Sequence, residues 1–178
     1  MKYIALLRGI NVGGNNLIKM ADLKAVFEDG GFQNVSTYIQ SGNVLFESDD
    51  DNSTSVSKKL EKLLSETFVM SLRVMVRSYD ELRTVLTDVP HEWKTRDDIR
   101  CYVAFVREPV TEEDVVKEIK LKDGVDFVKT GPGVVYMTTL TSGLTKSGFT
   151  KLVGKKIYQD LTMRNYNTTR KIFELMGN

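Results

Sequence analysis

The order of the apolar patterns in the first 78 residues constrains the fold of this chain more than any other feature. Short β-rich runs and stretches with helical spacing of apolar residues follow one another as strand, helix, strand, strand, helix and strand. They cover residues 2–8, 20–29, 35–40, 44–47, a helix from near Ser53, and residues 72–76. This is the order of the split βαβ, or ferredoxin-like, arrangement, in which two crossover helices pack on an antiparallel sheet.

The same order begins again after residue 99. Strands are predicted at residues 100–106, 125–129 and 134–138, helices at 146–156 and 165–176, and a further helix opens on the acidic turn Thr111–Asp114. We therefore expect an α+β protein of two tandem ferredoxin-like (βαββαβ-type) units, the second degenerate and carrying an extra C-terminal helix. The expected organisation is a first unit at 1–78, a helical connector at 79–99 that starts with a capping-box pattern, and a second unit at 100–178, all packed as one compact body.

Charge and composition limit the classes of function. The formal net charge of +1 gives no overall attraction to nucleic acid or to an anionic membrane, so no membrane partner is expected. The single histidine, His91, and the single cysteine, Cys101, make a zinc site improbable. No metal and no cofactor is expected, the predicted location is cytoplasmic, and no catalytic constellation is recognisable. Whether the chain is an enzyme therefore stays open.

Two motifs unlike ordinary core sequence are predicted to meet. The loop Gly9–Lys19 follows the first strand, and the turn Gln40–Asn43 follows the second. A right-handed crossover makes these strands parallel, so both motifs leave the sheet at the same edge. The candidate ligand-binding residues at this edge are Arg8, Gly9, Asn11, Gly13, Gly14, Asn15, Lys19, Gln40, Ser41, Gly42 and Asn43.

The loop resembles a phosphate loop only in part. Gly9 and Gly14 have the G-x-x-x-x-G spacing, but Asn15 and Asn16 stand where Lys and Ser or Thr would follow. A nucleoside-triphosphatase is therefore disfavoured, whereas a looser anion site of backbone N–H groups, Arg8 and Lys19 remains open. The alternative is structural: glycine and asparagine tolerate positive φ, and asparagine side chains satisfy the backbone of a loop.

A third cluster lies near the C-terminus. Residues 144–178 hold seven basic and two acidic residues, a local net charge of +5. Its candidate ligand-binding residues are Arg164, Asn165, Tyr166 and Asn167. A basic stretch with interleaved tyrosines can contact phosphates and stack a base, but a solvated basic face is the commoner explanation of such a stretch.

These motifs also carry a family resemblance. The stretches ALLRGINVGG, KMADLKAVFEDGGFQNVSTYIQSGNVLFES and RNYNTTRKIFEL resemble domain-of-unknown-function family 1697, an uncharacterised conserved bacterial family that is also found more widely. The resemblance implies the duplicated ferredoxin-like arrangement and no established activity. Members often carry a basic residue where this chain has Asn15, which weakens a phosphate role for that position. They usually carry tryptophan where this chain has Tyr166, so an aromatic ring is retained for stacking or packing.

Three functions remain open at this point. The first is the binding of a phosphate-bearing ligand, a nucleotide or RNA, at the edge formed by the Gly9–Lys19 loop and the Gln40–Asn43 turn. The second is a structural or protein-interaction domain without a small ligand. The third is an enzyme for a small molecule, which lacks an evident general base in this sequence.

Overall fold

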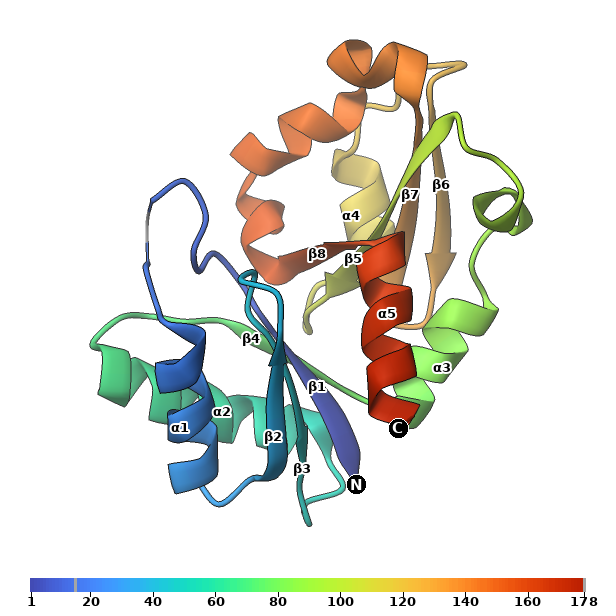
Figure 1. The fold of residues 1–178 in the computed structure, drawn as a ribbon. Coiled ribbons are helices and arrows are strands. Elements are labelled where there is room, and N and C mark those ends of the chain that lie inside the picture. Colours follow the sequence, from blue (N-terminus) through green and yellow to red (C-terminus); the bar gives the residue numbers. More distant parts are fainter. Residues whose placement is uncertain (15, 178) are drawn as a thin grey trace. The chain divides into compact units, whose positions relative to one another are not determined.

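The structure, a computed structural model, describes residues 1–14 and 16–177 (Figure 1). Asn15, one of the candidate residues, and Asn178 lie outside the described residues. The chain divides into two units, one made of Met1–Arg83 and Lys171–Asn178, the other of Thr84–Arg170. The domain boundaries expected from the sequence stay a prediction.

The first unit has the predicted order of elements. Its four strands form one antiparallel sheet of order β2-β3-β1-β4, with β3 and β1 in the centre and β2 and β4 at the two edges. Its elements are β1 (Lys2–Leu7), α1 (Met20–Asp29), β2 (Gln33–Tyr38), β3 (Asn43–Glu47), α2 (Ser53–Phe68) and β4 (Val74–Ser78). Element order and strand order together are those of the ferredoxin-like arrangement, as predicted.

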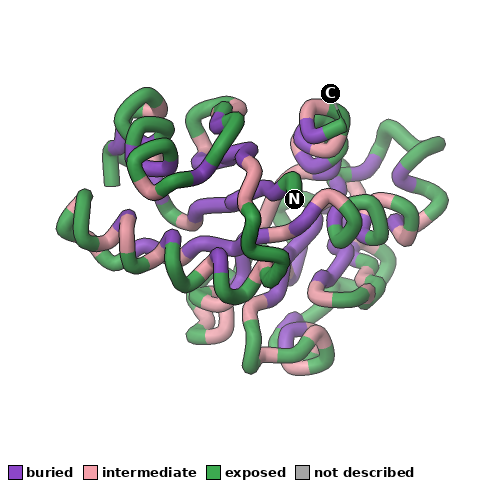
Figure 2. The backbone as a smooth tube through the Cα atoms, turned by 90° about the horizontal axis from the view of Figure 1, so that it is seen from below, coloured by how far each residue is buried: buried purple, intermediate pink, exposed green. Residues whose placement is uncertain are grey.

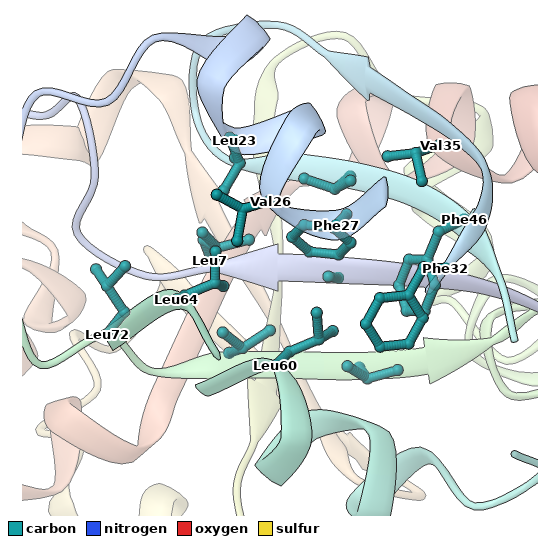
Figure 3. Packing of buried hydrophobic residues seen from close by; sticks show 14 of the residues in the cluster. Leu7, Leu23, Val26, Phe27, Phe32, Val35, Phe46, Leu60, Leu64 and Leu72 are labelled. Atoms are coloured by element: carbon teal, nitrogen blue, oxygen red, sulfur yellow. The ribbon is translucent and has the colours of Figure 1, made fainter. Parts of the chain in front are cut away.

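The core of this unit lies between one face of the sheet and the two helices (Figure 3). Leu23, Val26 and Phe27 of α1 and Leu60 and Leu64 of α2 pack there, because their spacing places them on one side of each helix. Burial is concentrated in β1, β3 and β4, whereas the helices also carry exposed residues on their outer faces; buried and exposed stretches of the chain are coloured in Figure 2. The helices therefore cover the sheet and leave the loops at its ends exposed.

The second unit repeats the strand order, but the connection between its third and fourth strands is different. Its sheet runs β6-β7-β5-β8, which matches the order of the first sheet strand by strand. The elements are β5 (Ile99–Val106), α4 (Glu112–Glu118), β6 (Asp126–Gly131), β7 (Val134–Leu140), the 3₁₀ helices η2 (Thr141–Lys146), η3 (Gly148–Gly154) and η4 (Lys156–Asp160), and β8 (Leu161–Asn165). The second unit is thus degenerate, as expected, because three short 3₁₀ helices stand where the first unit has α2.

Two details of the predicted second unit were wrong. The helix expected at 146–156 is replaced by these 3₁₀ helices, and the strand β8 was missed. Asn165 ends that strand, so the last helix, α5 (Tyr166–Gly177), begins one residue later than predicted. In the first unit the hairpin turn holds four residues, Ile39–Gly42, instead of the three, 41–43, between the two predicted strands, because Tyr38 pairs with Asn43.

The stretch between the sheets contains α3 (Tyr79–Thr87) and the 3₁₀ helix η1 (His91–Lys94). The predicted capping box is present: the Ser78 hydroxyl accepts the N–H of Glu81, and the Glu81 carboxylate accepts the N–H of Ser78. In η1 His91 is exposed, as expected for a surface loop, while Trp93 is buried and donates its indole N–H to Thr138 at 2.6 Å. This segment is therefore folded onto the second sheet through its tryptophan.

Candidate functional site

The two glycine-containing motifs of the first unit meet at the end of β1, as the strand topology predicts. The Leu7 N–H donates to the carbonyl of Gly42 at 2.8 Å, and the Asn11 side-chain amide donates to the carbonyl of Gln40 at 3.0 Å. In Figure 1 the loop that leaves β1 runs beside the turn between β2 and β3. The parallel orientation of β1 and β2, which are not adjacent, brings both motifs to this edge.

A third segment joins them. β4 pairs antiparallel with β1 so that Leu7 faces Val74, and the residues just before β4 therefore lie at the end of β1. The Arg8 N–H donates to the carbonyl of Arg73 at 3.1 Å. We call the three segments 8–19, 39–43 and 69–73 the β1 edge. Arg73 is not among the site residues predicted from the sequence, although the pairing of β4 with β1 in a ferredoxin-like sheet could have placed it there.

The Gly9–Lys19 loop contains a tight hairpin. The Asn11 N–H donates to the carbonyl of Asn16, and Gly13 and Gly14 between them have φ of +61° and +78°. Positive φ at two successive central residues is the signature of a type I′ turn, which favours glycine at both positions. The glycines of the motif are therefore required by the backbone. Among the described residues, none accepts a hydrogen bond from the N–H groups of Gly13 and Gly14.

The asparagine side chains stabilise the loop and the turn. The Asn11 amide nitrogen also donates to the carbonyl of Ile18, and its oxygen accepts the N–H of Ile18, both at 2.9 Å. Asn43 is fully buried and donates to the carbonyl of Tyr38 and to the hydroxyl of Ser41, both at 3.0 Å. These two amides serve the backbone, as the structural interpretation of the motif expected.

Gly42 is fixed by packing as well as by conformation. Its φ is +74°, and a β-carbon placed on it would stand within 2.9 Å of side-chain atoms of Ile10 and Leu7. A side chain at this position would therefore separate the turn from β1. Gln40, by contrast, is exposed, and so is Lys19, which occupies the N-cap position of α1 without capping it through its side chain.

The four candidate residues of the C-terminal cluster, 164–167, belong to the second unit. Tyr166 is buried and packs edge-on against Trp93, with ring centroids 5.2 Å apart, so its ring is used for packing. The Asn165 side chain accepts the N–H of Asn167 at 2.8 Å and caps the start of α5. Burial lowers the pKa of the Arg164 guanidinium to about 10, which still leaves it charged at neutral pH.

The second unit also holds a buried carboxylate that the sequence did not reveal. Asp126 accepts hydrogen bonds from the hydroxyls of Ser147 and Thr139 and from the N–H groups of Lys122 and Gly148, at 2.7 to 3.1 Å. Burial by itself raises the pKa of this carboxyl, but the four hydrogen bonds outweigh it and the net pKa is below its usual range. These hydrogen bonds link Asp126 to other segments of the same unit, so the carboxylate has a structural role.

Other candidates for chemistry are absent from the described part of the chain. Cys101 is buried, and desolvation raises the pKa of its thiol to about 11, as expected for an inert cysteine. No three His, Cys, Asp or Glu side chains of residues 1–14 and 16–177 gather closely enough to hold a metal ion. No helix in these ranges is long and apolar enough to cross a bilayer.

Comparison with known proteins gives the chain its family. The model of the family described as "Protein of unknown function (DUF1697)" matches residues 1–136, which include the whole β1 edge. The chain belongs to this family. A solved structure, that of the conserved bacterial protein SP0830 from Streptococcus pneumoniae, is similar over 98% of both chains, with a TM-score of 0.85 and 28% sequence identity. Comparison with curated proteins found no match.

Proposed function

We propose that this member of the DUF1697 family binds a phosphate-bearing ligand at the β1 edge. The nucleotide and the RNA considered from the sequence are two sources of such a phosphate. The observation that carries the proposal is the charge of the edge: its three segments contain Arg8, Lys19 and Arg73 and no aspartate or glutamate. Positive side chains around exposed backbone N–H groups favour an anion, as in other nests of successive N–H donors.

The backbone adds donors to this charge. The N–H groups of Gly13 and Gly14 have no acceptor among the described residues, and both glycines are exposed. Lys19 ends the same loop at the N-cap of α1, where the helix dipole also favours negative charge. The turn explains why glycine is needed at these two positions. Support for a ligand comes from Lys19 and from the N–H groups of Gly13 and Gly14.

Binding without acid–base catalysis suits the edge best. None of its three segments contains Asp, Glu, His or Cys, which supply most general acids and bases. The structural role of Asn11 and Asn43 favours the second candidate, a domain without a small ligand. That candidate does not account for the exposed Lys19 and the exposed N–H groups of Gly13 and Gly14 in the same loop.

A thermal-shift titration with soluble phosphate compounds tests the proposal. We would compare the wild type with Lys19→Ala, which alters an exposed side chain, and with Arg8→Ala, at low and moderate salt. Ligand at about 100 times its Kd stabilises by about 2.7 kcal/mol, which raises Tm by about 5–10 °C in a protein of this size. The rise should weaken with salt, since salt screens exposed charges.

Lys58→Ala is the matched control, because it removes an exposed lysine from the middle of α2. It should leave the ligand-induced rise in Tm unchanged. A ligand-induced rise in Tm that persists in both Arg8→Ala and Lys19→Ala, or no rise with any phosphate compound, would contradict the proposal and favour a domain without a small ligand.

A further inference from the structure

The second unit repeats the backbone contact between the first strand and the hairpin turn. The N–H of Leu7, the last residue of β1, donates to the carbonyl of Gly42 at 2.8 Å. The N–H of Val106, the last residue of β5, donates to the carbonyl of Gly133 at 2.9 Å. Each glycine stands directly before the third strand of its unit, and the two φ values are +74° and +69°. The first strand therefore ends against the same kind of turn in both units.

The residue that follows each first strand makes an equivalent contact as well. The Arg8 N–H donates to the carbonyl of Arg73, directly before β4, at 3.1 Å. The Arg107 N–H donates to the carbonyl of Asp160, directly before β8, at 2.9 Å. We call the corresponding end of the second sheet, residues 107–111, 132–133 and 160, the β5 edge. Because the strand orders also match, the β5 edge is an internal control for what the fold itself requires.

The two edges differ in the connection from the first strand to the first helix. Five residues, 107–111, join β5 to α4, which is within the usual range of about 2–6 for such loops. Twelve residues, 8–19, join β1 to α1. The hairpin around Gly13 and Gly14 has no counterpart in residues 107–111. The second unit builds the same strand end, turn and sheet without it, so the fold does not require the hairpin.

The hairpin is nevertheless held in a defined position. Ile10 and Ile18 are buried in the core of the first unit, and the Asn11 side chain bonds to both backbone groups of Ile18. Between these anchors the loop is exposed, and Val12 and Leu17 have exposed fractions of 63% and 74%. Ordering an exposed segment costs conformational entropy. A loop that is ordered at this cost, and that the fold does not need, is a typical place for binding.

The β5 edge holds an anion of its own chain. The carboxylate of Glu112, the first residue of α4, accepts the N–H of Gly133, and Thr111 before it caps the helix through its hydroxyl. The equivalent positions of the first unit, the N-cap and the first residue of α1, are Lys19 and Met20. A cation and a thioether thus stand where the second unit has a hydroxyl and a carboxylate. An external anion is therefore favoured at the β1 edge and disfavoured at the β5 edge.

The donors of the loop are suited to one phosphate group. They are the exposed Lys19 and the exposed N–H groups of Gly13 and Gly14. Residues 8–19 and 39–43 contain no Phe, Tyr, Trp or His on which a base could stack, and the flanking Tyr38 is half-buried. Single-stranded nucleic acid is bound through several phosphates and through stacked bases. A small molecule with a single phosphate group matches this loop better.

We propose that the hairpin of the Gly9–Lys19 loop binds one phosphate group of a small molecule, and that each chain binds one such molecule. A sugar monophosphate has the required chemistry, and a nucleobase adds nothing to the binding. This inference rests on the proposed function and narrows its ligand to a small monophosphate recognised without its base.

Isothermal titration calorimetry with matched ligands tests the class of ligand. AMP carries an adenine that ribose 5-phosphate lacks, and a short single-stranded RNA adds further phosphates and bases. We expect one ribose 5-phosphate per chain, and neither AMP nor the RNA should bind more than about fivefold tighter, since a stacked base would contribute at least that factor. Two molecules per chain, or tighter binding of AMP or of the RNA than this limit, overturns the inference.

A tip variant tests the role of the hairpin. Residues 12–17 are replaced by two glycines, which keeps both buried isoleucines. Its Tm should stay within about 4 °C of the wild type, because exposed loop tips tolerate such changes. It should bind ribose 5-phosphate at least about tenfold more weakly, and so should Lys19→Ala, in which the loop is intact. Lys146→Ala is the matched control, because it removes an exposed lysine from η2 of the second unit, and it should bind as the wild type does.

The outcomes separate this inference from the proposed function. A tip variant that does not fold shows that the fold needs the hairpin, and a tip variant with unchanged affinity shows that the phosphate lies elsewhere; either result overturns the inference. A marked preference for AMP or RNA overturns it as well but leaves the proposed function standing. If no phosphate compound binds the wild type or raises its Tm, both fail.

Discussion

Side-chain amides of asparagine supply hydrogen-bond partners for main-chain groups at the β1 edge. Asn11 and Asn43 bond to main-chain groups of the loop and the turn, where no sheet ladder or helix can supply partners. Their residue types were recognisable in the sequence, because asparagine in a glycine-containing loop favours this role. Their partners were not, since the carbonyl of Gln40 is 29 positions away from Asn11 in the sequence.

Replacing Asn11 by glycine should destabilise the protein markedly. Glycine accepts the positive φ of +53°, but the substitution removes four side-chain hydrogen bonds, one of them to the sulfur of Met20. We expect a loss of about 1–3 kcal/mol in the free energy of unfolding, measured by urea denaturation. Asn16→Gly is the control: it has φ of +49° and one exposed side-chain hydrogen bond, to Gly9. Equal losses in the two variants would contradict the structural role of Asn11.

The buried Asp126 should make stability depend on pH. Its pKa is lowered in the folded protein, so its carboxylate stabilises the fold above the ordinary pKa of about 4 and this contribution is lost as pH falls through the folded value. Asp126→Asn should therefore be less stable than the wild type at pH 7, and the difference should shrink on acidification. Urea denaturation of both proteins over a pH series measures this. A difference that stays constant below pH of about 4 would show that the charge has no role.

At the scale of elements, the largest difference between prediction and structure lies in the connection between β7 and β8 of the second unit. Apolar residues in 146–156 suggested a helix, but Gly148 and Gly154 lie within the stretch, and each glycine costs a helix about 1 kcal/mol. The structure shows what Gly148 gains: a β-carbon there would overlap the carbonyl oxygen of Lys120, and its N–H bonds to Asp126. Close packing against a distant loop therefore overrides the helical pattern.

Gly148→Ala should be strongly destabilising for this reason. The added methyl group meets backbone, which has no room to rotate away, so we expect a loss of about 1–3 kcal/mol or more. Gly154→Ala is the matched control in the same 3₁₀ helix, because a β-carbon there has no neighbour within 4 Å and its φ is not positive. It should change the free energy of unfolding by about 1 kcal/mol or less. Comparable thermal stabilities of the two variants would refute the packing argument.

Prediction from the sequence succeeded where local patterns and topology rules agree. The first unit, its helix spans and the meeting of its two motifs follow from periodicity and strand handedness. β8 was missed because it has five residues, of which only Leu161 and Met163 are apolar, and its polar end joins α5 directly. The exposed aliphatic residues of the β1 edge could not be recognised, since exposure and the sign of φ are properties of the folded chain.

At the scale of the whole molecule, two sheets of the same strand order are built from one chain, and the first unit is discontinuous in sequence. The part of α5 that starts at Lys171 belongs with residues 1–83. Phe173 stacks on Tyr79 with ring centroids 4.6 Å apart and an interplanar angle of 15°. This contact joins the C-terminal helix to the first turn of α3.

Phe173→Ala should loosen the first unit locally. Loss of the stacked pair should lower the free energy of unfolding by about 0.5–1.5 kcal/mol, in addition to the loss that comes from burying less apolar area. Hydrogen exchange should show faster exchange of the amides of α3 around Tyr79. Phe127→Ala is the control, because Phe127 is 48% exposed on β6 of the second unit. Unchanged protection around Tyr79 in Phe173→Ala would show that the stack contributes nothing to this unit.

The return of the chain to the first unit has a consequence for synthesis on the ribosome. Residues 1–83 emerge first, but the segment that begins at Lys171 emerges only after all of Thr84–Arg170. At elongation rates of about 5–20 residues per second, this delay lasts roughly 4–17 s. The first 83 residues therefore wait for their last segment while the whole second unit is synthesised, and the unit whose translation starts first is not complete before the second unit has been translated.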